Sequence, residues 1–198
     1  MKFIKALLAA LILLPALTPA QTPKLNLKLV HSSTGELRKK QQIERLAAKY
    51  DLKKYTITRD IIIEERAINH SSPILTLNLL FLDDDDRALG VYVHEQAHWL
   101  LMERHRGKPR TEMLPELKRM YPDLKIEPPD GDGNEGTSYI HLVVLMLEWQ
   151  ALEDLIGVER ARAVMKAGRQ HNYKALFATV IDNRKQMEEF LKRYDVKW

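Results

Sequence analysis

Two histidines and a glutamate stand close together in residues 91–101, at a spacing that can hold and use a metal ion. His94 and His98 are four residues apart, Glu95 directly follows the first, and the neighbouring residues are mostly apolar. In a helix, residues four apart lie on one face with β-carbons about 6 Å apart, so both imidazoles can reach one ion. Glu95 is rotated by one residue and can reach a metal-bound water without ligating the metal. The spacing predicts a metal site with His94 and His98 as ligands.

Zinc is the metal that this combination favours. The chain contains no cysteine, so the ligands must come from histidine, aspartate and glutamate side chains. Bound Zn²⁺ lowers the pKa of its water to about 7, and a carboxylate beside that water can accept the proton. We therefore expect Glu95 to act as a general base, a role typically worth about 10²–10⁴ in rate. Without a metal, Glu95 would be an unpaired acid in an apolar helix, which is costly to bury.

On these residues the chain resembles the zincin metallopeptidases, whose defining motif is H-E-x-x-H on a helix beside a small sheet. The resemblance covers the motif helix, the strand before it and one later helix. It implies Zn²⁺ as cofactor, His94 and His98 as ligands, Glu95 as general base and general acid, and a peptide or protein substrate cleaved at a peptide or amide bond. Residues 74–99 and 141–152 are also similar to small uncharacterised exported bacterial proteins of this type.

The motif does not fix the third ligand. The metzincin form of the family has glycine and histidine where this chain has Leu101 and Arg104, and His105 stands one residue too late. The gluzincin form takes a glutamate from a later helix, which makes the chain gluzincin-like and Glu148 the first choice. His141, two helical turns earlier on the same face, is the alternative ligand.

If Glu148 completes the metal shell, His141 is free to donate a hydrogen bond to the oxyanion of a tetrahedral intermediate, and Tyr139 is a second candidate for this role. The gluzincin pattern is incomplete, because Leu152 stands four residues after Glu148 where thermolysin-like members have an aspartate. The predicted catalytic residues are Glu95 and His141, and the predicted metal ligands are His94, His98 and Glu148.

The N-terminus has the form of a secretory signal peptide. Two lysines precede an apolar run over residues 6–17, and Thr18-Pro19-Ala20 suits cleavage before Gln21. This apolar run is too short for a membrane-spanning helix, which needs about 20 residues. We expect residues 1–20 to be removed, and residues 21–198 to form a single catalytic domain that is periplasmic or secreted and has no stable membrane insertion.

The charged residues do not indicate nucleic-acid binding. The chain has 31 lysines and arginines against 27 acidic residues, a formal net charge of +4, and the two signs alternate along helical stretches. A nucleic-acid-binding protein would instead gather basic residues on one face or along one helix.

Periodicity predicts several helices and two strands, and the resemblance to zincins implies an α+β fold, a mainly helical zincin-like domain with a small β-sheet packed on the motif helix. Residues 55–64 and 74–79, rich in isoleucine, threonine and leucine, are the predicted strands. Helical spacing of apolar residues predicts helices over residues 36–50, 85–105, 111–120, 138–156, 158–167 and 173–194.

Four further features bear on the predicted site. Four consecutive aspartates at residues 83–86 are expected to cap the motif helix, whose N-terminal amides favour negative charge. Gly90, one turn before His94, can let a strand or a partner helix approach closely. The strand at residues 72–78 is where zincins add an extended substrate. The loop over residues 121–136 is rich in proline and glycine and is a candidate lid.

Two other functions are compatible with the sequence. One is a catalytically idle zincin-fold protein that serves as a metal-binding or protein-interaction module. The other is a helical protein that binds no metal. Glu95 favours the hydrolase, because a pair of metal ligands alone would not need a carboxylate at this position.

Overall fold

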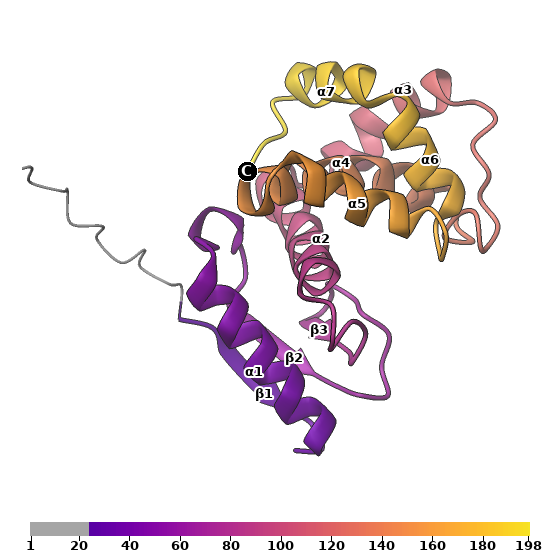
Figure 1. Cartoon of the computed structure of the whole chain (residues 1–198). Helices are drawn as coiled ribbons and strands as arrows, with labels where there is room; N and C mark the ends of the chain where they lie inside the picture. The colour runs from indigo at the N-terminus through magenta and orange to yellow at the C-terminus, as the bar shows by residue number, and fades with distance from the viewer. Residues whose placement is uncertain (1–23) are drawn as a thin grey trace, which may run out of the picture.

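The computed structural model describes residues 24–198, so the predicted signal peptide lies outside the described residues. Three short parallel strands, β1 (Asn26–Leu29), β2 (Asp60–Ile63) and β3 (Leu75–Leu77), form one sheet in the order β1-β2-β3. Parallel neighbours need a crossover connection, and helix α1 (Thr34–Lys49) provides it between β1 and β2. This sheet and α1 make up the lower part of the molecule in Figure 1.

The remaining elements are helical, and the predicted α+β class with a small sheet is confirmed. The motif helix is α2 (Asp85–Arg104), which packs against β3 and against α4. The other elements are the short 3₁₀ helix Lys53–Tyr55, the π-helical turn Pro109–Met113, α3 (Leu114–Met120), α4 (Glu135–Ile156), α5 (Val158–Gly168), α6 (Lys174–Asp182) and α7 (Arg184–Arg193).

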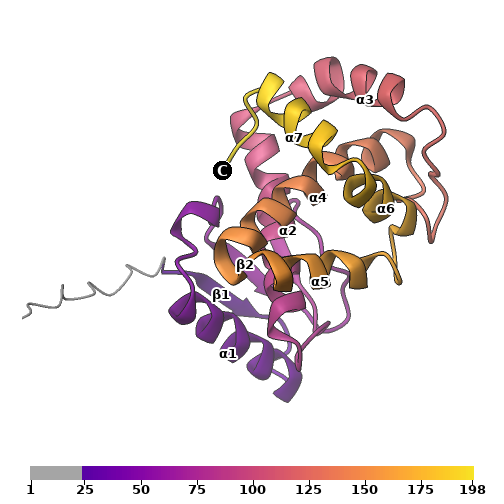
Figure 2. The same cartoon turned by 45° about the horizontal axis from the view of Figure 1, so that its top comes forward.

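Helix α4 forms the centre of the helical part. It packs against α2, α3, α5, α6 and α7, and Figure 2 shows it among α2, α5, α6 and α7. Residues 142–147 are apolar and completely buried, as expected for a helix that is hydrophobic on all sides. This burial fixes α4 against α2, which is the pair of helices that carries the predicted site.

Two differences from the predicted elements have local causes. The predicted helix over residues 173–194 is divided at Asn183, whose side-chain amide donates to the carbonyl of Thr179 at 2.9 Å and so ends α6. Asparagine competes with the backbone for such hydrogen bonds and is a poor residue for a helix interior. Strand β1 was not predicted, because it has four residues, of which Asn26 and Lys28 are exposed.

The N-terminus of α2 is capped as predicted. Asp84 is the N-cap residue, and its carboxylate accepts from the backbone amide of Arg87 at 3.1 Å. The other three aspartates form ion pairs that tie the start of α2 to α1 and α5: Asp83 with Arg38, Asp85 with Arg45, and Asp86 with Arg160.

Three side chains anchor the face of α2 that carries Tyr92, Gln96 and Trp99. The Gln96 carboxamide is fully buried and makes three hydrogen bonds of 2.8–3.0 Å to backbone groups of the segment before β2. The Tyr92 hydroxyl is hydrogen-bonded to the same segment, and the Trp99 indole donates to the segment before β3. The partners are Thr56, Ile57, Thr58 and Ser71.

The outer edge of β3 is already paired at Thr76. The amide and carbonyl of Thr76 bond to the carbonyl and amide of His70 at 2.8 and 3.1 Å, which forms an isolated antiparallel bridge. The prediction that an extended substrate adds to this strand is therefore wrong at Thr76, because the groups it would need are occupied by the chain itself.

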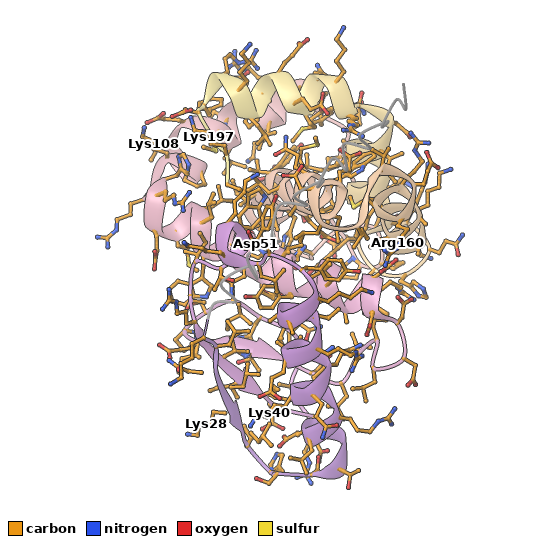
Figure 3. The ribbon with its side chains drawn as sticks, turned by 60° about the vertical axis from the view of Figure 1, so that its left-hand side comes forward. Lys28, Lys40, Asp51, Lys108, Arg160 and Lys197 are labelled. Carbon is orange, nitrogen blue, oxygen red and sulfur yellow. The ribbon has the colours of Figure 1, made fainter. Side chains whose placement is uncertain are left out.

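Charged side chains are spread over the molecule. Figure 3 shows Lys28 and Lys40 beside the sheet and α1, Arg160 on the helical part, and Lys108 and Lys197 at another corner. Among residues 24–198, no helix combines the length and the apolar character needed to cross a membrane.

Candidate metal centre

Three histidine side chains converge where α2 packs on α4. His94 and His98 come from α2 and His141 comes from α4, and each offers a ring nitrogen within 4.8 Å of the other two. The ring centroids are 5.1 Å apart for His94 and His98, 5.5 Å for His94 and His141, and 4.8 Å for His98 and His141. Three nitrogens on one tetrahedral Zn²⁺ lie about 3.4 Å apart. Small side-chain adjustments would bring this histidine triad to that spacing.

Hydrogen bonds at the Nδ1 atom orient two of the three rings. Nδ1 of His94 donates to a carboxylate oxygen of Glu148 at 2.9 Å, and Nδ1 of His141 donates to the backbone carbonyl of Thr137 at 3.0 Å. These bonds fix the tautomer, so the Nε2 atom of each ring is free to accept a metal ion. Histidine ligands in metal sites are typically oriented in this way by a carboxylate or a carbonyl.

Glu148 therefore lies in a different place from the one predicted. It contacts the outer nitrogen of His94, and among the described residues it forms no group with both His94 and His98 that could hold an ion. The residue that the structure groups with His94 and His98 is His141. The cause is helix geometry. His141 and Glu148 are seven positions apart, which corresponds to about 10 Å along the axis of α4, so the two side chains meet α2 at different points along its length.

Burial and neighbouring charges give the imidazoles different protonation properties. Burial and then the adjacent imidazoles hold the pKa of His98 well below its ordinary value, and burial and then His94 lower that of His141 to about 4. Both rings are therefore neutral at neutral pH, the form that binds a metal. Burial opposes the charged form of His94 as well, but the hydrogen bond and charge of Glu148 outweigh it and raise the pKa of His94.

Glu95 is buried next to the triad, with 6% of its surface exposed. Desolvation raises the pKa of its carboxyl group to about 7; the charge of Glu148 adds to this, while that of His94 opposes it. A cation held by the triad would favour the carboxylate form. Glu95 is thus a titratable carboxyl group in a largely water-excluded site, beside the residues that could hold the ion.

Comparison with known proteins does not name this arrangement. No protein-family model, curated protein or solved structure matches the chain. What the site can do is therefore argued from its own geometry.

Other residues considered from the sequence lie outside the triad. The hydroxyl of Tyr139 donates to the carbonyl of Tyr121 at 2.7 Å, and His105 is the C-cap residue of α2. Asn134, in the loop before α4, is the N-cap residue of that helix. Neither Tyr139 nor His105 belongs to a group that could hold a metal among the described residues.

A second group with metal-ligating side chains lies near α1 and consists of His31, Glu36 and Glu64. The Glu36 carboxylate accepts from the backbone amides of His31 and Ser32 at 2.8 Å and from that of Glu65 at 3.3 Å. These bonds explain its burial as part of the turn that starts α1. No comparable bonds to backbone amides explain why the three histidines of the triad lie together.

Two residues next to the triad were not predicted as part of the site. The ring of Tyr173 lies 4.8 Å from that of His141, and its hydroxyl donates to the carboxylate of Asp132 at 2.8 Å. The charge of Asp132 acts on both His94 and His141. Tyr173 follows α5 by several residues in an irregular segment, and no local pattern in the sequence indicates that this segment returns to α4.

Gly90 allows α2 to approach α4 and α5 closely. This agrees with the prediction that a partner helix could approach the motif helix at this glycine. A β-carbon at this position would lie 3.1 Å from Oε1 of Glu148 and 3.3 Å from a methyl group of Val164. The missing side chain thus makes room for the carboxylate that holds His94.

We expect Gly90→Ala to destabilise the fold, because the crowding of Glu148 and Val164 costs about 1–3 kcal/mol, which exceeds the gain of about 1 kcal/mol from helix propensity. Gly136→Ala is the matched control, since a β-carbon there meets its nearest atom at an ordinary 3.5 Å in the first turn of α4. Urea unfolding of both variants measures the effect. Equal stability of the two would contradict the tight fit at Gly90.

Proposed function

We propose that this chain is a zinc-dependent hydrolase in which His94, His98 and His141 bind the metal and Glu95 activates the attacking water. The observation that carries the proposal is the convergence of the three imidazoles beside the buried carboxyl group of Glu95. Three protein ligands and one open position are the arrangement of catalytic zinc sites, whereas structural sites use four protein ligands.

The donor set fits zinc. Neutral imidazole nitrogens suit Zn²⁺, and the low pKa values of His98 and His141 keep both rings in the neutral form. Glu148 and the carbonyl of Thr137 hold two of the rings in the tautomer that binds a metal through Nε2. These two contacts give the rings of His94 and His141 a defined orientation.

When bound, zinc would lower the pKa of a water molecule and polarise the bond to be cleaved. Glu95 would accept the proton of that water and later donate it to the leaving group, as a carboxyl group buried beside the metal can do. Glu148 would keep the His94 ring in position and would itself stay away from the reacting atoms. This division of roles differs from the first sequence interpretation in two ways, because His141 becomes a ligand instead of an oxyanion donor and Glu148 becomes the residue that orients His94 instead of a ligand.

The substrate class that we propose is a peptide or a related amide, on the resemblance of the motif to zincins. The place of action that we propose is the periplasm or the extracellular space, on the form of residues 1–20. A metal-binding module without catalysis is the second candidate, and it would use the same three histidines but would not need Glu95 as a base.

We expect the purified protein to contain about one zinc per chain, as three histidine ligands require, and to cleave components of a broad peptide mixture. Dialysis against a chelator should abolish cleavage, and added zinc should restore it. Metal analysis and mass spectrometry of the mixture make the measurement. Zinc without any cleavage would favour the idle module, and absence of zinc would overturn the proposal.

A further inference from the structure

The loop before α4 is attached to the start of α6 by three hydrogen bonds. The backbone amides of Lys174 and Ala175 donate to the carbonyls of Pro129 and Asp130 at 3.0 and 3.1 Å, and the Tyr173 hydroxyl donates to Asp132. Helix α6 has no side-chain cap at its N-terminus, so the loop carbonyls satisfy two of the amides that a helix leaves free there. We call the two segments, residues 129–132 and 173–175, the strap.

The strap carries Tyr173 in an unusual backbone conformation. Its φ and ψ angles are +60° and +35°, in the left-handed region that costs a non-glycine residue about 1–2 kcal/mol. Such strain persists only where the surrounding structure imposes it and often occurs at functional positions. Here it accompanies a placement of the aromatic ring against His141 and of the hydroxyl group on Asp132.

His141 is the buried member of the triad, and Tyr173 is the aromatic ring packed against it. His141 is 5% exposed, and the side chain of His94 is 13% exposed. A surface hollow of about 450 Å³ is lined by Asp130, Lys174 and Ala175 among others, and none of the three histidines lines it. A ligand that must reach the ring of His141 therefore has to pass the side chain packed on it, which is Tyr173.

We propose that Tyr173 is the gate of the metal centre and that Asp132 is its latch. In the closed state the ring covers His141 and the hydroxyl group is held by the carboxylate of Asp132. The gate opens when this hydrogen bond breaks and the side chain turns away, while the two backbone bonds of the strap keep α6 in place. This inference rests on the proposed function only in taking the triad as a metal site.

The gate makes a kinetic prediction that does not require a known substrate. In Tyr173→Ala, which loses both the ring and the hydrogen bond to Asp132, zinc should enter and leave more than tenfold faster, because one hydrogen bond to a charged group alone accounts for about tenfold. The equilibrium affinity for zinc should change much less, since no ligand is lost. Tyr173→Phe, which keeps the ring but loses the latch, should accelerate both steps by a smaller factor. Stopped-flow mixing of apoprotein with zinc, and of zinc-loaded protein with a chromogenic chelator, measures the two rates.

Tyr194→Ala is the matched control. The Tyr194 hydroxyl also donates to a carboxylate, that of Glu116 at 2.6 Å, and its ring also lies 4.8 Å from an aromatic ring, that of Phe190, but these residues lie outside the triad. Its zinc rates should equal those of the unaltered protein.

The possible outcomes separate the two proposals. If the unaltered protein binds zinc but Tyr173→Ala exchanges it no faster than Tyr194→Ala does, the gate alone is overturned. Faster release without faster uptake would also overturn it, because that result indicates weakened ligation by His141. Absence of zinc binding by the unaltered protein would overturn the metal site and the gate together.

Discussion

Replacing Glu95 by glutamine should leave zinc binding near one ion per chain and lower hydrolysis by about 10²–10⁴, the usual contribution of a general base. Glutamine has nearly the same size and shape as glutamate, so the packing beside His94 is preserved, but its amide cannot take a proton from water. Glu95 is buried next to the triad, and desolvation raises the pKa of its carboxyl group to about 7, which is why we propose this residue as the proton acceptor.

Glu103→Gln is the control for this change, since Glu103 lies on the same helix in an exposed position. It should keep both zinc and turnover. The comparison needs metal analysis and initial rates on the best peptide from the mixture. Full turnover in Glu95→Gln would show that Glu95 is not the base, and loss of zinc from the same variant would indicate that its carboxylate takes part in holding the metal.

Replacing His141 by alanine should remove zinc from the protein at micromolar concentration, because only His94 and His98 would remain as ligands. Glu148→Gln should behave differently. It keeps a side-chain oxygen that can accept from Nδ1 of His94 but loses the negative charge, so zinc should still bind, with an affinity weakened by about 10–100-fold as is typical for partners of metal-bound histidines.

His105→Ala controls for the loss of any histidine near α2 and should keep full zinc affinity, since His105 caps the end of this helix. Competition with a zinc chelator of known affinity gives dissociation constants for all three variants. If Glu148→Gln lost zinc while His141→Ala kept it, the ligand set would be the one first expected from the sequence, and the structural assignment would be wrong.

The elements that carry the site could be predicted because their signals are local. The spacing of His94 and His98 and the aspartates before them indicated a capped helix, which α2 is. The apolar run after residue 138 indicated the buried helix α4. These are properties of a single segment, so neighbours in sequence are enough to reveal them.

The choice between His141 and Glu148 could not be predicted, because it depends on the level at which α4 crosses α2. Both residues lie on the same face of one helix, and a shift of two turns would exchange their roles. Gly90 helps to set that level by admitting Glu148 beside α2. Tyr173 and Asp132 were missed for a related reason, since the strap joins segments about 40 residues apart with no pattern common to both.

The hydrogen-bonded side chains on the opposite face of α2 affect how accurately the imidazoles of the triad are oriented. Tyr92, Gln96 and Trp99 each precede or follow a histidine by one or two positions, and residues two apart in a helix point about 200° from one another. Tyr92 and Gln96 therefore face away from His94 and His98 while bonding to the chain before the sheet. Because these hydrogen bonds lie on the opposite face of α2, a rotation of the helix about its own axis would break them. Catalytic groups need alignment within about 0.5 Å and 10–20°, so the segment before β2 acts through Gln96 to set the direction of the face that carries His94 and His98.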